Sequence, residues 1–144
     1  MEITKEQQVL LKEFKETLKE WNATHNLVSA SQTKELDSHI LDSLSIKDHL
    51  TNNIVDLGSG GGFPGIPLAI ALPKNKFFLI ESNQKKAAFL LHTSNKLCLT
   101  NTTIINQRAE AINVAILPLP IEIITRAFGT LVSTLKVTRG LLKL

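Results

Sequence analysis

Residues at alternate positions in one short stretch indicate a site where the backbone itself contacts a ligand. Asp56, Gly58, Gly60 and Gly62 form the pattern D-x-G-x-G-x-G, which begins inside the apolar stretch "NIVDL" and continues past its end. Glycine lets a chain turn sharply and approach a ligand closely, because it has no Cβ. In a doubly wound sheet such a turn follows the first strand, at the edge where ligands bind. We interpret "DLGSGGGFPG" as a ligand-binding loop, and the alternative, a flexible linker, is disfavoured by the strand and helix patterns that flank it.

The residues around these glycines narrow the choice of ligand. A phosphate-binding loop ends in Gly-Lys-Ser or Gly-Lys-Thr, and the sequence contains neither. A dinucleotide turn has the pattern G-x-G-x-x-G, and Phe63 stands at the place of its third glycine. Glu81 closes a second apolar stretch about 20 residues later, where a carboxylate accepts hydrogen bonds from both ribose hydroxyls. We therefore expect an adenosine-containing ligand with Glu81 at its ribose; the alternative for Glu81 is a position near a helix N-terminus.

Two later segments place polar groups at the same edge. In "NQRAEAI", Glu110 or the backbone N–H of Ala109 is placed to bind an adenine edge, although Arg108 and Glu110 are also ordinary surface charges. Arg126 ends another strand, where a guanidinium pairs with a carboxylate or a phosphate. No acid–base pair stands out, and we assign no catalytic residue.

Alternating strands and helices position these residues. Strands are expected at 53–57, 76–81, 102–107 and 121–127. Helices are expected at 64–72, 82–97 and 129–144, with Ser82 as the cap of the second and a short helix within 108–113. This pattern predicts an α/β fold, a parallel sheet with helices on both faces.

The first 52 residues have a different character. Thr4 and Gln7 fit a capping box at the start of a helix that breaks near "NATHN", and a second helix is expected over about 34–49. We divide the chain into a helical extension, 1–52, and a ligand-binding domain, 53–144. Three polar residues of the extension either close over the ligand or serve structural roles such as capping: Asn26, His39 and Asp42.

Charge and composition exclude several classes of protein. Residues 1–52 carry a net charge of −3 and residues 53–144 a net charge of +6, which suits an anionic partner or a solvated surface. The single cysteine, Cys98, permits no disulfide framework, and no Cys/His spacing fits zinc, so we expect no metal and a reducing cytoplasm. The polar start lacks a signal-peptide core, and no apolar run reaches the roughly 20 residues that span a bilayer. We expect no membrane partner.

Six segments carry a resemblance, in order, over nearly the whole chain: "WNATHNLVSA", "HILDSL", "DLGSGGGFPGIPLA", "KKAAFL", "RAE" and "TRAF". They resemble the RsmG (GidB) family of bacterial 16S ribosomal RNA guanine-N7 methyltransferases. The resemblance implies a Rossmann-like class I methyltransferase fold, S-adenosyl-L-methionine as cofactor, and 16S ribosomal RNA of the small ribosomal subunit as substrate. It also implies that the cofactor contacts Gly58, Phe63, Ala109, Glu110 and Arg126. Gly60 and Glu81, discussed above, complete the set of predicted cofactor-binding residues.

The resemblance also bears on mechanism. Guanine N7 has a free lone pair, so methyl transfer from a sulfonium needs no general base and depends on positioning. Two alternatives remain: a truncated, non-catalytic relative that holds cofactor or RNA, and a nicotinamide-dependent dehydrogenase, against which Phe63 argues.

Chains of the resembled family continue beyond the helix at which this sequence stops, Leu144. We therefore expect a complete cofactor half, missing C-terminal strands, weak cofactor binding and little or no RNA methylation. The unpaired edge of strand 121–127 predicts self-association, as does an apolar last helix with Leu131, Val132, Leu135 and Leu142.

Overall fold

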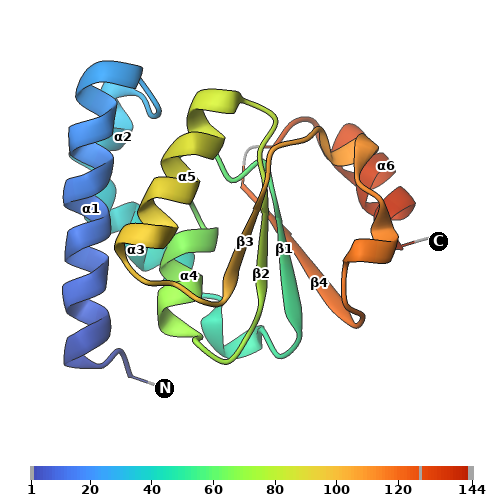
Figure 1. Cartoon of the computed structure of the whole chain (residues 1–144), viewed down its shortest axis with the longest axis horizontal. Coiled ribbons are helices and arrows are strands. Elements are labelled where there is room, and N and C mark those ends of the chain that lie inside the picture. Colours follow the sequence, from blue (N-terminus) through green and yellow to red (C-terminus); the bar gives the residue numbers. More distant parts are fainter. Residues whose placement is uncertain (1, 127, 143–144) are drawn as a thin grey trace.

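A parallel sheet forms the centre of the computed structural model, which describes residues 2–126 and 128–142 (Figure 1). Its strands are β1 (Asn53–Leu57), β2 (Phe77–Ile80), β3 (Thr102–Ile105) and β4 (Ile121–Thr125), in the order β3-β2-β1-β4. The chain runs outward from β1 to β3 and then returns to the other side of β1. In such sheets the crevice beside the central strand, at its carboxyl end, is the expected ligand site.

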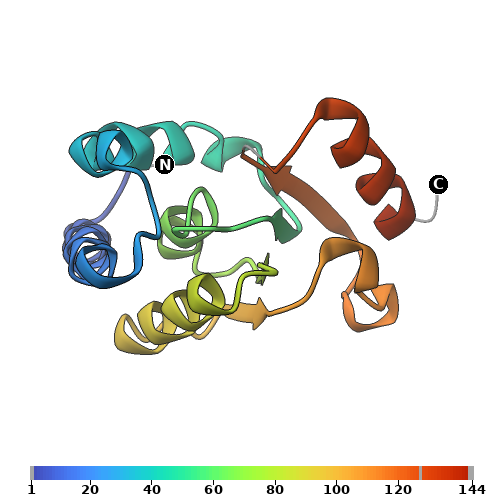
Figure 2. The ribbon, with the colours of Figure 1, turned by 90° about the horizontal axis from the view of Figure 1, so that it is seen from above.

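Helices cover both faces of this sheet, as the sequence predicted (Figure 2). One face carries α4 (Gly65–Ala71) and α5 (Gln84–Lys96), and the other carries α6 (Leu131–Leu142) with the 3-10 turns η2 (Ala109–Ala111) and η3 (Val114–Ile116). Every residue of α4 is buried, because the sheet lies on one side of it and further helices lie on the other. A helix that is apolar all round is stable only in such an enclosed place.

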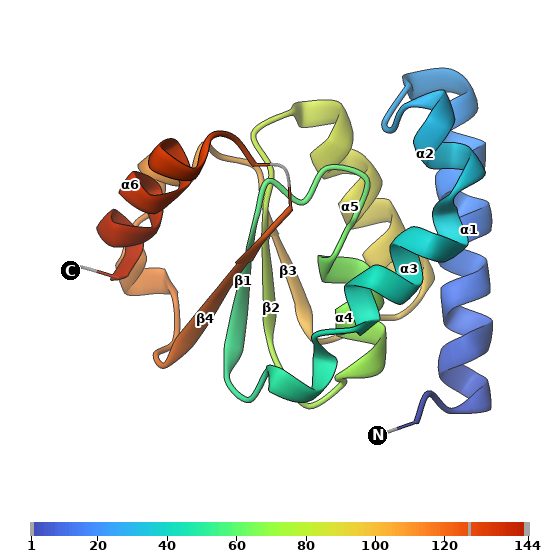
Figure 3. The same cartoon turned by 180° about the vertical axis from the view of Figure 1, so that it is seen from behind.

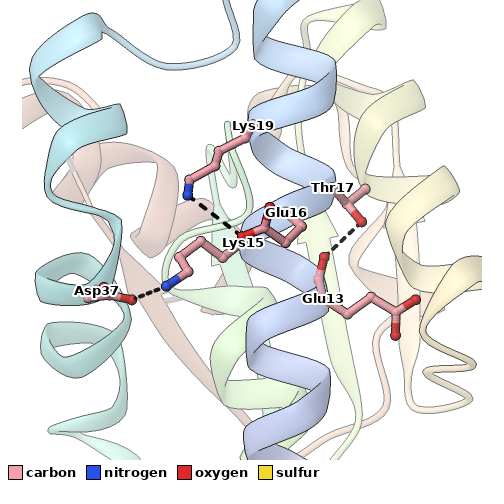
Figure 4. Close-up of polar contacts among 6 residues, drawn as sticks. All are labelled: Glu13, Lys15, Glu16, Thr17, Lys19 and Asp37. Atoms are coloured by element: carbon pink, nitrogen blue, oxygen red, sulfur yellow. Dashed lines mark hydrogen bonds and ion pairs between the residues drawn. The ribbon is translucent and has the colours of Figure 1, made fainter.

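The enclosing helices come from the N-terminal segment. They are α1 (Lys5–His25) and α3 (Leu36–Leu44), which pack outside α4 and share its apolar core (Figure 3). Phe14 and Leu18 of α1 are completely buried in that core. An ion pair also joins the two helices, with 2.7 Å between Lys15 Nζ and Asp37 Oδ1 (Figure 4). Since the Asp37 side chain is 79% exposed, this pair contributes little beside the apolar contacts.

The capping box predicted at the start of α1 is confirmed. Thr4 Oγ1 accepts a hydrogen bond from Gln7 N at 3.1 Å, and Thr4 N donates to Gln7 Oε1 at 2.9 Å. The helix ends at His25, because Asn26 adopts a left-handed conformation with φ of 49°. Asn26 therefore caps α1, one of the two roles considered for it.

The single helix predicted over 34–49 is wrong. Within it the structure has α3 and a 3-10 turn, η1 (Lys47–His49), and a separate helix, α2 (Ala30–Lys34), precedes them. A second capping box starts α2 early, since Ser29 Oγ accepts from Gln32 N at 3.2 Å and Ser29 N donates to Gln32 Oε1 at 3.0 Å. Glu35, with φ of −115° and ψ of 24°, then separates α2 from α3.

Smaller differences lie at the element ends. Asn83, not Ser82, caps α5, because its side chain accepts from Lys86 N at 3.0 Å. Strands β2 and β3 end earlier than predicted, because the chain leaves the sheet at Glu81 and Asn106 to form the ligand edge. Ala127, included in the predicted fourth strand, lies outside the described residues. Among the described residues, no helix is long and apolar enough to cross a membrane.

Candidate functional site

The glycine loop has one fixed course at the carboxyl end of β1. Gly58, Gly60 and Gly62 have φ of +70°, +55° and +98°, a region that side chains with a Cβ rarely adopt. Gly58 N donates to Ile80 O at 2.9 Å, and Gly62 N donates to Ser59 O at 2.8 Å. These bonds hold the loop against β2 and lead it into α4, which excludes a flexible linker.

Asp56 supports the loop from below. It is completely buried, and its Oδ2 accepts a hydrogen bond from Gly65 N, at the start of α4, over 3.0 Å. Its Oδ1 has no partner in the described part of the chain. Burial raises the pKa of Asp56 to about 7; hydrogen bonds from Ser59 and Gly65 oppose this rise, and the charge of Glu81 adds to it. Asp56, the aspartate of the glycine motif, therefore supports the loop from the protein interior.

Glu81 links the loop to the next helix. The residue is 7% exposed, and its Oε1 accepts from Gly60 N while its Oε2 accepts from Asn83 N, both at 2.8 Å. Each carboxylate oxygen has capacity for a further hydrogen bond. The role at a ribose stays a prediction, and the structure adds a second role, which is to hold Gly60 in place.

Two neighbouring cavities flank the loop and bring the predicted site residues together. One, of about 370 Å³, has in its lining Gly58, Gly60, Glu81, Ala109 and Glu110. The other, of about 180 Å³, has in its lining Gly58, Gly60, Phe63 and Arg126. All seven predicted cofactor-binding residues thus lie around one loop, five on one side and four on the other, with the two glycines shared.

Arg126 lies among aromatic and imidazole rings in the smaller cavity. Its Nη2 hydrogen-bonds His39 Nδ1, and its Cζ lies 5.8 Å from the centre of the Phe63 ring. His39 lies 5.8 Å from Phe63, and Phe14 packs edge-on against the same ring at 5.3 Å. The Phe63 ring therefore contacts side chains of the N-terminal helices and the arginine that follows β4.

The N-terminal segment supplies one wall of the smaller cavity. Leu27, Val28 and Gln32 line it beside His39, and Asp42 lines neither cavity. A Cβ on Gly61 would lie 2.6 Å from Val28 Cγ1, so only glycine lets this wall approach so closely. No local sequence pattern indicates the contact of Gly61 with Val28, since the two residues are far apart in the chain.

Lys86 is the main site residue that the sequence reasoning missed. It lies in the first turn of α5 and lines both cavities. In the sequence it appeared only within "KKAAFL", as part of the resemblance. In the smaller cavity Lys86 and Arg126 supply positive charge. In the larger cavity Lys86 and Arg108 lie beside the negative charge of Glu81 and Glu110.

Comparison with known families decides which proteins the chain is related to. The GidB model, described as rRNA small subunit methyltransferase G, matches residues 7–144. This chain belongs to that family. The resemblance carried by the six sequence segments is thereby confirmed.

Individual GidB relatives agree with this result. Proteins named ribosomal RNA small subunit methyltransferase G include one from Coxiella burnetii (strain Dugway 5J108-111), 50% identical over 93 residues, or 63% of this chain and 46% of the relative. Another, from Nitrosococcus oceani, is 42% identical over 92% of this chain and 62% of its own length. One from Chromobacterium violaceum is 39% identical over 99% of this chain and 68% of its own length. The chain thus spans about half to two thirds of these GidB relatives.

A solved structure supports the fold class. The precorrin-6y C5,15-methyltransferase from Geobacter metallireducens GS-15 matches with a TM-score of 0.58 and 18% identity, over 82% of this chain and 59% of that one. At this identity the likeness shows the fold alone, a Rossmann-like sheet. In the part of this GidB chain that the structure describes, no group of three or more His, Cys, Asp or Glu could hold a metal ion.

Proposed function

We propose that this chain binds S-adenosylmethionine across the glycine loop and serves an rRNA small subunit methyltransferase that modifies guanine N7 in 16S ribosomal RNA. The observation that carries the proposal is the pair of cavities on the two sides of Gly58 and Gly60, in a chain of the GidB family. Because bacterial ribosomes lie in the cytoplasm, we propose that the protein acts there.

The polar groups of the two cavities suit the two ends of this cofactor. Glu81 accepts hydrogen bonds from ribose hydroxyls, and Ala109 and Glu110 lie in the same cavity, where an adenine is expected. Arg126 and Lys86 lie in the other cavity, where a methionine carboxylate finds positive charge. When bound, the cofactor supplies an activated methyl group on a sulfonium. The residues of the two cavities hold the two ends of the cofactor, and the glycine loop lies between these ends.

The site suits a nucleophile that needs no deprotonation. Asp56 is completely buried beneath the loop and accepts from Gly65 N, so it cannot reach a substrate. His39 Nδ1 is engaged with Arg126. Guanine N7 presents a lone pair directly, so alignment of that atom with the methyl group is the main requirement. The +6 charge of residues 53–144 favours an RNA partner.

A binding and transfer experiment tests this function. Calorimetry should show that the chain binds S-adenosylhomocysteine and not NAD. Tritiated methyl transfer to small ribosomal subunits, followed by borohydride and aniline cleavage of the RNA, then detects N7-methylguanine. Binding of NAD without binding of S-adenosylhomocysteine would support a dehydrogenase instead. Binding of S-adenosylhomocysteine without transfer would support the second alternative, a non-catalytic cofactor-binding relative.

A further inference from the structure

We propose that His39 is a positioning residue for the cofactor, acting through Arg126. Its Nδ1 accepts a hydrogen bond from the Arg126 guanidinium and holds that group where it faces the carboxylate of the methionine moiety. This inference rests on the proposed function, because it assigns an orienting partner to a residue of the same cavity.

The contact between His39 and Arg126 has a defined chemical direction. A guanidinium carries five N–H donors and no acceptor, so the histidine nitrogen that meets it must be the acceptor. This hydrogen bond requires the tautomer of His39 that carries its proton on Nε2. Within residues 2–126 and 128–142, no carboxylate forms an ion pair with Arg126, and the hydrogen bond from its side chain goes to His39. Within the described residues the positive charge of Arg126 thus has no acidic partner, and a bound anion would supply one.

The other ring nitrogen argues against a packing role. His39 Nε2 is buried and has no hydrogen-bond partner in the described part of the chain. A buried donor without a partner destabilises a fold, so an apolar side chain of similar size would pack there at lower cost. Histidine at this place is explained by what its Nδ1 does for Arg126.

Phe63 restricts the guanidinium from a second direction. The Arg126 Cζ lies 5.8 Å from the Phe63 ring centre, a distance at which a cation is attracted to an aromatic face. The histidine bond and the ring contact together limit the positions open to a long side chain. The donors that do not meet His39 are then oriented before the ligand arrives, which lowers the entropy lost on binding.

Two amide variants separate the acceptor from the bulk of the side chain. In His39→Asn an oxygen can take the place of Nδ1, whereas His39→Gln reaches the place of Nε2 and leaves Nδ1 empty. We expect His39→Gln to weaken S-adenosylhomocysteine binding by about 10-fold, the scale of one hydrogen bond to a charged group. His39→Asn should stay within about 2-fold of the wild type, since that bond is retained.

A double-mutant cycle shows whether His39 acts through Arg126. In an Arg126→Ala background, His39→Gln should cause no further loss of affinity, because the group that it orients is absent. Equal losses in the two backgrounds, or equal losses in His39→Asn and His39→Gln, would overturn the positioning role alone. A wild-type chain that does not bind S-adenosylhomocysteine would overturn the proposed function as well.

Nitrogen NMR of the ligand-free chain gives a readout that does not depend on binding or on stable variants. The 15N shifts of His39 should show a protonated Nε2 and an unprotonated, hydrogen-bonded Nδ1. Arg126→Ala should move the Nδ1 signal, and Lys85→Ala, an exposed residue of α5 that lines neither cavity, should not. A protonated Nδ1 in the wild type would contradict the proposal.

Discussion

Asp56 is a buried acid whose protonation affects the stability of the whole glycine loop. Its pKa in the folded protein, about 7, lies above the ordinary value of 3.8, so folding favours the neutral form. This contribution is fully present below about pH 4 and is lost as the pH rises through about 7. We expect the free energy of unfolding to fall over that range by a few kcal/mol, at ~1.4 kcal/mol for each pKa unit.

Denaturant unfolding between pH 4 and 8 measures this effect. Asp56→Asn should flatten the profile, because the amide oxygen still accepts from Gly65 N and carries no charge at any pH. Asp37→Asn, which changes an exposed carboxylate on α3, should leave the slope unchanged. Parallel profiles for the wild type and Asp56→Asn would show that Asp56 is already ionised in the folded state.

Gly60 tests the backbone role of the loop. Its φ is +55°, and a Cβ there would meet only Gly58 O, at 3.7 Å, so a side chain would project toward the ligand space. We expect Gly60→Val to abolish S-adenosylhomocysteine binding in calorimetry, with a folding loss of roughly 1–3 kcal/mol from the left-handed backbone. Gly140→Ala in α6, where nothing lies within 4 Å, is the matched control and should bind normally.

At the scale of elements, α1 supports the ligand site through α4 and Phe63. Phe14 is completely buried and packs against Phe63 at 5.3 Å. We expect Phe14→Ala to lower the free energy of unfolding by about 3–5 kcal/mol and to weaken cofactor binding, because Phe63 loses its support. Val9→Ala, on the exposed side of α1 at 63% exposure, should change neither by a measurable amount.

Loss of stability without loss of affinity in Phe14→Ala would show that α1 is a separate layer. That result would favour the division of the chain at residue 52, which stays a prediction. Thermal unfolding and calorimetry on the same samples distinguish the two outcomes.

Local signals account for most of what the sequence predicted at this scale. The strand 53–57 was predicted with its observed bounds, because an apolar run there ends directly at glycines. The start of α2 at Ala30 was missed although Ser29 and Gln32 repeat the spacing of Thr4 and Gln7. The contact of His39 with Arg126 joins residues 87 positions apart, and no local pattern encodes it.

For the whole molecule, one end of the sheet exposes apolar surface. β4 is an edge strand, and α6 beside it exposes Leu131, Val132 and Leu135 by 75%, 63% and 57%. Unpaired strand edges and apolar patches favour association. We expect sedimentation velocity to show reversible self-association that increases with protein concentration.

A substitution pair tests whether α6 is responsible. Leu135→Gln should shift the distribution toward the monomer without lowering thermal stability, since the residue packs against little. Leu41→Gln, on α3 and 70% exposed, removes similar apolar surface elsewhere and should leave association unchanged. A wild-type chain that stays monomeric at high concentration would contradict the prediction.

The smaller cavity has one more consequence, which concerns the order in which the chain is made. Its walls include Leu27 and His39, which leave the ribosome early, and Arg126, which leaves it 87 positions after His39. The cavity therefore forms only after β4, which precedes Arg126, has joined the sheet. A ligand that bridges both walls therefore cannot assist the early stages of folding during synthesis. Such a ligand would bind, and so select, chains in which β4 has already docked.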